Sequence, residues 1–450
     1  DESPYDFMRK RLTIVVAREG KAAEHLIITK GAFANVLAVC SVDAALRERL
    51  EAYYRQKGTE GYRLLAVATK RVAARERYGR EDERGMSFAG FLLFFDPPKA
   101  DAQKTIRDLA ALGIRVKVIT GDNRYVAAHV AAAIGLDPKA MLTGEEVARL
   151  KDESLWHLAE RTDLFVEVDP QQKERIVRAL QRIGHAVGYL GDGINDAPSL
   201  HAADVGISVE KAVDVARESA DVILLQHDLD VLRRGVEDGR ATFANTLKYI
   251  SITTSANFGN MVSMALATPL LPFLPLAAKQ ILLNNFLSDL PSIAISTDNV
   301  DAEHTARAQR WNVNAVRRFM IVFGLISTVF DLLTFVLLLQ VFEADEATFQ
   351  TAWFVVSLLT ELAVVLVLRT HGPALRSMPS RLLLWTTLAV GALALVISYA
   401  GPLASAFGFV PLPWHLILAM ILIVIAYIVS TEAAKARFFR QDRGGAVNRA

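Results

Sequence analysis

Cysteine and net charge are both nearly absent from the sequence. Cys40 is the one cysteine among 450 residues, which excludes an internal disulfide framework and any cysteine-rich zinc or iron–sulfur site. Lysine and arginine number 50 and aspartate and glutamate 49, so the formal net charge is +1. Nucleic-acid binders usually have a basic excess, so this balance argues against a nucleic-acid partner. A content of 52% hydrophobic residues excludes a disordered chain.

Charged residues are scarce in long stretches of the second half. They are dense up to about residue 240, and the apolar runs that follow predict six transmembrane helices in contact with lipid. Each run is near the ~20 residues that cross a bilayer. The last two contain no charged residue, which favours membrane spans over helices buried in a soluble core. The predicted spans are 245–270, 279–297, 319–342, 351–368, 382–399 and 414–431.

Positively charged residues are concentrated in every second segment that joins or follows these spans. Segments 298–318 and 369–381 and the tail after residue 431 contain several arginines or lysines, whereas 271–278 and 400–413 contain none. Basic segments stay on the cytoplasmic side of a membrane. We therefore expect the polar N-terminal half and the C-terminus to be cytoplasmic.

The polar half alternates strand-like and helix-like stretches. Apolar stretches at 116–119, 164–168 and 186–190 read as strands, and helical patterns at 123–134 and 171–182 follow the first two. Acidic and glycine residues stand where these strands end. This pattern predicts an α/β fold with a doubly wound parallel sheet, whose site lies at the carboxyl edge of the strands.

The strongest chemical signal is the run Gly191-Asp192-Gly193-Ile194-Asn195-Asp196-Ala197-Pro198. It places two carboxylates, Asp192 and Asp196, at one strand tip, with Asn195 between them. Mg²⁺ prefers one or two carboxylates together with phosphate and water. A bare Gly-Asp-Gly would read as a turn, but the eight-residue run predicts a Mg²⁺ site.

Two further elements suit a phosphoryl group. Thr120-Gly121-Asp122 follows the strand at 116–119, and its hydroxyl and the N–H groups of the next helix can bind phosphoryl oxygens. Lys173 stands at the start of the helix at 171–182 and can supply a fixed positive charge. Each signal is weak alone, because such turns and lysines are usually structural.

Together these motifs resemble the second, third and fourth motifs of the haloacid-dehalogenase superfamily. Asp96-Pro97-Pro98-Lys99 and Lys30-Gly31-Ala32 narrow the resemblance to P-type ATPases. It implies a partial α+β nucleotide-binding domain at 1–93, a HAD-like phosphorylation domain at 94–240, membrane helices at 241–431 and a cytoplasmic tail at 432–450.

The same resemblance implies roles for individual residues. Thr120, Gly121, Asp122, Lys173, Asn195 and Asp196 would serve phosphoryl transfer, and Asp192 with Asp196 would bind the catalytic Mg²⁺. Lys173 would contact a phosphorylated aspartate. ATP would be bound by residues that match adenine-stacking, pocket and phosphate-contacting positions, namely Phe7, Lys30, Gly31 and Arg63.

One motif of the family is missing. The phosphorylated aspartate of P-type ATPases lies in an Asp-Lys-Thr-Gly-Thr motif, which occurs nowhere in this sequence. The phosphorylation domain would then lack its first strand. We expect the chain to be a C-terminal fragment that needs a missing N-terminal half and does not turn over ATP alone. A membrane-anchored HAD phosphatase or a non-catalytic remnant is the alternative.

The first, second and fourth predicted spans contain candidate ligands for a transported cation. Asn257 and Asn260 share a face of the first span, and Asn285 and Asp289 stand four residues apart in the second. Pro291 removes an N–H and frees a backbone carbonyl near them. Glu361 adds a carboxylate in the fourth span. Carboxylate and amide oxygens suit a hard cation such as Mg²⁺ or Ca²⁺.

The surroundings of these residues resemble the bacterial magnesium-transporting P-type ATPases. The matching runs are Asn257-Phe258-Gly259-Asn260, Thr297-Asp298-Asn299-Val300-Asp301, Gln309-Arg310-Trp311-Asn312 and Trp353-Phe354-Val355-Val356. The resemblance implies ATP-driven Mg²⁺ uptake into the cytoplasm, with an aspartyl-phosphate intermediate, at a bacterial inner membrane. Calcium and proton pumps of the same class are the alternatives.

Overall fold

A computed structural model describes residues 1–6, 9–18, 21–226 and 228–447. The chain divides into two compact units, Asp1–Arg233 and Arg234–Ala450. The first unit is mixed α and β, and the second is helical. This division falls close to the boundary that the charge pattern predicts near residue 240.

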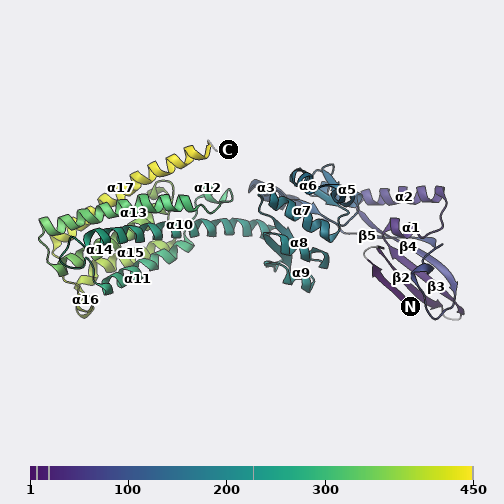
Figure 1. Cartoon of the computed structure of the whole chain (residues 1–450), viewed down its shortest axis with the longest axis horizontal. Helices are drawn as coiled ribbons and strands as arrows, with labels where there is room; N and C mark the ends of the chain where they lie inside the picture. The colour runs from purple at the N-terminus through teal and green to yellow at the C-terminus, as the bar shows by residue number, and fades with distance from the viewer. Residues whose placement is uncertain (7–8, 19–20, 227, 448–450) are drawn as a thin grey trace. The chain divides into compact units, whose positions relative to one another are not determined.

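The first unit begins with a five-stranded antiparallel sheet in the order β1-β2-β3-β4-β5 (Figure 1). In β4, Leu64, Ala66 and Ala68 are buried at every second position, as expected of a strand with one face on a core. Helices α1 (Phe33–Leu37) and α2 (Ala44–Thr59) contact β4. The strand bounds are β1 (Glu2–Asp6), β2 (Arg11–Arg18), β3 (Lys21–Gly31), β4 (Tyr62–Ala73) and β5 (Ser87–Phe95).

The rest of this unit contains two separate parallel sheets, ordered β6-β8-β7 and β11-β10-β9. The strands pair in parallel, as predicted, but no described strand pairs with both β6 and β9. The expectation was a parallel sheet that lacks its first strand. The bounds are β6 (Val118–Ile119), β7 (Met141–Thr143), β8 (Leu164–Val166), β9 (Gly188–Leu190), β10 (Val205–Val209) and β11 (Val222–Leu224).

Helix α7 (Pro170–Arg182) joins the cores of these two sheets. Its Ile176 belongs to a buried cluster with Phe165 of β8, and its Val177 belongs to another with Tyr189 of β9. Ile119 packs against both clusters. The two sheets thus share an apolar interior. The other helices of this unit are α3 (Ala102–Ala111), α4 (Arg124–Ala133), α5 (Gly144–Arg149), α6 (Asp152–Arg161), α8 (Ala197–Ala202) and α9 (Asp214–Glu218).

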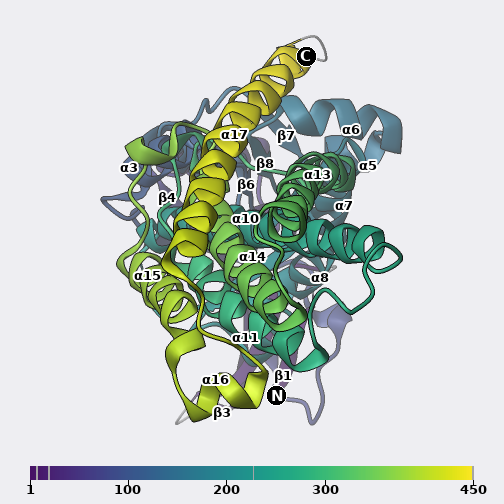
Figure 2. The ribbon, with the colours of Figure 1, turned by 90° about the vertical axis from the view of Figure 1, so that its left-hand side faces the viewer.

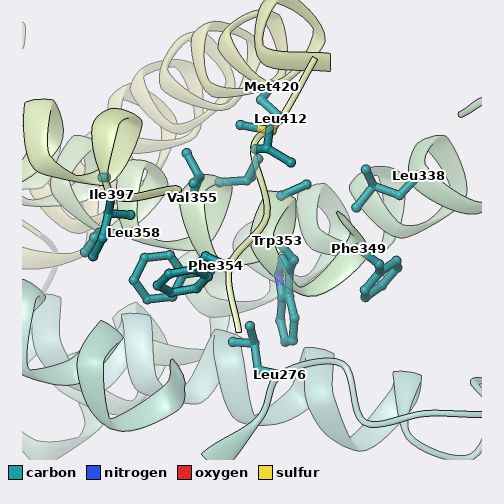
Figure 3. Packing of buried hydrophobic residues seen from close by; sticks show 14 of the residues in the cluster. Leu276, Leu338, Phe349, Trp353, Phe354, Val355, Leu358, Ile397, Leu412 and Met420 are labelled. Atoms are coloured by element: carbon teal, nitrogen blue, oxygen red, sulfur yellow. The ribbon is translucent and has the colours of Figure 1, made fainter. Parts of the chain in front are cut away.

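The second unit is a bundle built around α14. Figure 2 shows α14 among α10, α11, α13, α15 and α17. Within the 18-residue apolar stretch of α14, 89% of the residues are buried. Buried side chains of α14, including Trp353, Phe354 and Leu358, form the largest apolar cluster with neighbouring helices (Figure 3). The bounds are α10 (Asp230–Ala267), α11 (Ala278–Ala294), α12 (Ala302–Thr305), α13 (Val313–Val336), α14 (Glu346–Leu368), α15 (Arg381–Val396), α16 (Pro402–Phe407) and α17 (Trp414–Val447).

Four of the six predicted spans are long and apolar enough to cross a membrane. They are Val313–Val341, Glu346–Leu368, Arg381–Tyr399 and Trp414–Arg440, counted within the described residues. The first two predicted spans form helices α10 and α11, which do not meet this criterion of length and hydropathy. Helix α11 has 17 residues and includes the polar Asn284, Asn285 and Asp289, which lower its hydropathy.

The last helix is longer than predicted. Helix α17 continues past Thr431 to Val447, so the predicted tail at 432–450 is helical as far as the structure describes it. The segment after Thr431 contains Glu432, Ala433, Ala434 and Lys435, all of which favour a helix. The predicted span at 414–431 is the apolar part of this longer helix.

Candidate functional site

Thr120, Gly121 and Asp122 lie where β6 ends. The Thr120 hydroxyl oxygen accepts a hydrogen bond from the Asp122 N–H at 3.1 Å, which tightens the turn. Asn123 then caps α4, because its side-chain oxygen accepts from the N–H groups of Tyr125 and Val126. The start of this helix therefore follows directly on the strand tip, in the arrangement that suits a bound anion.

Lys173 and Asp196 form an ion pair at the tip of β9. The Lys173 ammonium lies 2.7 Å from Asp196 Oδ1, and the buried Tyr189 hydroxyl donates to the same oxygen at 2.9 Å. Asp196 Oδ2 accepts from the Gly193 N–H at 3.2 Å. Asp169 and Pro170 begin α7 and so place Lys173 in its first turn.

These contacts shift the pKa values of Asp196 and Tyr189. Burial raises the pKa of Asp196, but the hydrogen bonds from Lys173, Tyr189 and Gly193 outweigh it and hold this pKa below its usual value. Burial, with the nearby Asp196 charge, raises the pKa of Tyr189. Asp196 is therefore ionised and Tyr189 is a neutral donor at neutral pH.

Asp192 and Asn195 lie exposed on the same loop. Within the described residues, neither side chain makes a hydrogen bond, so Asp192 offers an open carboxylate beside the buried Asp196. No three His, Cys, Asp or Glu residues of the described chain form a cage for a metal ion. The loop thus offers the one or two carboxylates that Mg²⁺ takes alongside water and phosphate.

The residues expected to bind nucleotide lie on the antiparallel sheet. Lys30 is exposed near the end of β3, and Gly31 is buried. A Cβ atom at Gly31 would lie 2.3 Å from the Lys10 carbonyl oxygen, so this close approach requires glycine. Phe7 lies outside the described residues.

Arg63 and Asp122 bring two of the predicted groups together. Arg63 of β4 lies 2.6 Å from Asp122 Oδ2, and the arginine side chain is 54% exposed. This contact joins the strand bearing the expected phosphate-contacting arginine to the turn expected to bind a phosphoryl group. Sequence reasoning assigned the two residues separate roles and did not pair them.

A buried acidic residue of the antiparallel sheet region was not predicted. Glu83 is 1% exposed and pairs with Arg9 and Arg11, each at 2.7 Å, and Thr13 donates to it at 2.8 Å. Burial raises the pKa of Glu83, but these three partners hold it below its usual value. Glu83 belongs to no sequence motif, so only the structure could identify it as a buried, paired carboxylate.

The second unit has a cavity of about 180 Å³, lined by residues of α10, α11 and α14. The structure places Asn257, Asn285, Asp289 and Glu361 on its wall. Pro291 lies inside α11, beyond Asp289 in sequence, and leaves the Leu287 carbonyl without its helical donor. The complete lining is Ile252, Thr253, Ala256, Asn257, Asn285, Ser288, Asp289, Ser292, Glu361, Leu362 and Val365.

Glu361 accepts hydrogen bonds from two amides. Asn260 Nδ2 donates to Glu361 Oε1 at 2.5 Å, and Asn284 Nδ2 donates to Oε2 at 3.4 Å. Asn260 therefore contacts Glu361 instead of lining the cavity. The buried oxygens Oγ1 of Thr253 and Oδ1 of Asn284 have no hydrogen-bond partner among the described residues. Unsatisfied buried oxygens of this kind suit a bound cation or water.

Asp298 ties the same three helices together at one end. It follows α11 and is fully buried, with Arg369 from the end of α14 at 3.1 Å and Lys248 of α10 at 2.9 Å. The sequence placed Asp298 in a matching run but did not predict this role. The ion pair fixes the helices that line the cavity.

The carboxylates and the lysine lie at the tips of parallel strands, and the same chain has helices able to cross a membrane. Together these features define a HAD-like hydrolase fused to a membrane domain. Residues 17–204 match the family model for haloacid dehalogenase-like hydrolases. Residues 273–437 match the model for the C-terminus of cation-transporting ATPases. The chain belongs to the P-type ATPases.

Curated relatives include two magnesium-transporting ATPases and a calcium-transporting one. "Magnesium-transporting ATPase, P-type 1" of Escherichia coli K12 is 42% identical over 457 residues, covering 98% of this chain and 51% of the relative. A protein of that name from Salmonella typhimurium LT2 is 37% identical over 457 residues, covering 98% and 50%. "Calcium-transporting ATPase" of Bacillus subtilis is 30% identical over 446 residues, covering 93% and 50%. The chain thus spans about half the length of these relatives.

Proposed function

We propose that the chain is the C-terminal part of an ATP-driven pump that moves Mg²⁺ into the cytoplasm through an aspartyl-phosphate intermediate. The observation that carries this proposal is the cavity between α10, α11 and α14, lined by Asn257, Asn285, Asp289 and Glu361. Carboxylate and amide oxygens are ligands of hard cations. A carboxylate beside a proline-interrupted membrane helix is a functional candidate by default. The two relatives named for magnesium transport support Mg²⁺ over Ca²⁺.

The first unit would serve phosphoryl transfer from ATP. Lys30, Gly31 and Arg63 would bind the nucleotide, and Thr120, Gly121 and Asp122 would bind the transferred group. Asp192, with Asp196 behind it, would hold a Mg²⁺ ion that neutralises the charge of the phosphoryl oxygens. Lys173, paired with Asp196, would supply a fixed positive charge at this site. Asn195 would support the site from the same loop.

The second unit would be the membrane domain of the pump. We propose that α10 and α11 cross the membrane together with the four apolar helices, because both line the cavity and their polar residues lower their hydropathy. Basic loops then place the first unit and the C-terminus in the cytoplasm of a bacterial cell, with the protein in its inner membrane.

The test is cation-stimulated ATP hydrolysis by the full-length protein. We expect Mg²⁺ to stimulate hydrolysis and Asp289→Asn to raise the Mg²⁺ concentration needed at least tenfold, since it removes a charged ligand. Glu343→Gln removes an exposed carboxylate outside the cavity lining and is the matched control.

Two outcomes would overturn the assignment. Stimulation that Asp289→Asn leaves unchanged would remove the cavity as the cation site. Stimulation by Ca²⁺, added over the Mg²⁺ that the catalytic site requires, and not by further Mg²⁺, would identify a calcium pump instead.

A further inference from the structure

Asp331 is a buried carboxylate of the helical unit that, unlike Asp298, makes no ion pair in the described chain and lies outside the cavity lining. Asp331 of α13 is 2% exposed. Its Oδ2 lies 2.6 Å from the Ser263 hydroxyl of α10, and its Oδ1 accepts from the Trp353 indole N–H of α14 at 3.0 Å. One side chain thus links three helices.

Asp331 has no positive partner in the described part of the chain. The titratable groups of the described chain that its charge affects are Glu361 of α14 and Tyr427 of α17. Helix α10 faces it with the neutral Ser263. An ionised Asp331 would be an uncompensated negative charge near a second acid, among helices suited to a membrane, which is unfavourable.

The hydroxyl of Ser263 has two possible acceptors and only one proton to donate. Its oxygen lies 2.9 Å from the Gly259 carbonyl oxygen and 2.6 Å from Asp331 Oδ2. A protonated Asp331 donates to Ser263, and Ser263 donates to Gly259, so every group is satisfied. An ionised Asp331 would take the Ser263 hydroxyl proton, and the Gly259 carbonyl would then keep its helical N–H donor and the Thr328 hydroxyl, at 3.2 Å.

We propose that Asp331 is a proton-binding site of the helical unit, a neutral carboxylic acid that donates to Ser263 and accepts from Trp353. It joins α10, α13 and α14 in this form. Asparagine is the geometric mimic of that acid, because its Nδ2 donates where the protonated Oδ2 does and its Oδ1 still accepts from Trp353. Leucine has a similar size and removes both hydrogen bonds.

Infrared spectroscopy of this chain in lipid bilayers tests the site without ATP or a transported cation. We expect the absorption band of a protonated carboxyl group in the wild type and its loss in Asp331→Asn. The same band remains in Glu361→Gln, the control for the other buried acid. The outcome does not depend on whether the pump moves Mg²⁺.

Thermal unfolding of the same variants completes the test. We expect Asp331→Asn to unfold at the wild-type temperature and Asp331→Leu to unfold at a lower one. An unchanged carboxyl band in Asp331→Asn would overturn the proposal. So would an Asp331→Asn protein that fails to fold or is destabilised as much as Asp331→Leu, because the charge would then be required.

Discussion

Single buried charges organise the first unit, and Glu83 is the clearest case. It pairs with Arg9 and Arg11 and accepts from Thr13 while remaining 1% exposed. Removing one partner of a buried pair leaves the others uncompensated, which costs about 3 kcal/mol. We expect Glu83→Gln to destabilise the antiparallel sheet by about this amount, measured by hydrogen exchange of β2 and β3 amides.

The same residue predicts a pH dependence. The pKa of Glu83 is lower in the folded chain than its usual value, so its contribution to stability is present at neutral pH. It is lost as pH falls through the usual glutamate pKa, about 4.3, towards the folded value. Exchange protection in the wild type should fall in this range, and Glu83→Gln should lack that component. Equal protection of both proteins at neutral pH would contradict the prediction.

Residue roles differ in how far the sequence could predict them. Asp192, Asp196 and Lys173 stand in motifs, so their neighbourhood at strand tips was predictable. The donation of Tyr189 to Asp196 was not, because a tyrosine in a buried strand reads as core. Asn284 was missed for a similar reason, since only its neighbour Asn285 had the helical spacing to Asp289.

At the scale of elements, α10 and α13 cross at two glycines. A Cβ atom at Gly259 would lie 2.9 Å from Ser327 Cβ and 3.0 Å from the Gly324 carbonyl oxygen. We expect Gly259→Ala to destabilise the helical unit by about 1–3 kcal/mol, because overpacking forces the helices apart. Thermal unfolding of the chain in detergent checks this.

Gly235 supplies the matched control on the same helix. A Cβ atom there meets no described atom within 4 Å, so Gly235→Ala should be neutral or stabilise by up to about 1 kcal/mol. Equal effects of the two substitutions would show that the crossing is not tightly packed.

Elements were predicted best where one physical signal dominates. Long apolar runs identified α13, α14, α15 and α17, because membrane-length hydrophobicity is hard to mistake. Helix α11 is less apolar because its polar residues face the cavity or Glu361. The parallel strands form two sheets that no described strand joins, which is compatible with the expected lack of a first strand.

At the scale of the molecule, the chain joins a unit that matches HAD-like hydrolases to a helical one in a single sequence. Its 450 residues contain no Asp-Lys-Thr-Gly-Thr motif and span about half the length of the relatives it matches. The charge pattern predicted both units, and the motifs predicted the family. We therefore propose that this chain supplies the cation site and part of the catalytic site of a pump, and that the phosphorylated aspartate is not among these 450 residues.

Phosphorylation by labelled ATP tests that claim most directly. The measurement is acid-stable, hydroxylamine-sensitive incorporation of ³²P, compared between this chain and the full-length protein. We expect no labelling of the chain alone, and labelling of the full-length protein that Lys173→Met reduces. An acid-stable, hydroxylamine-sensitive phosphoenzyme on the chain alone would contradict it.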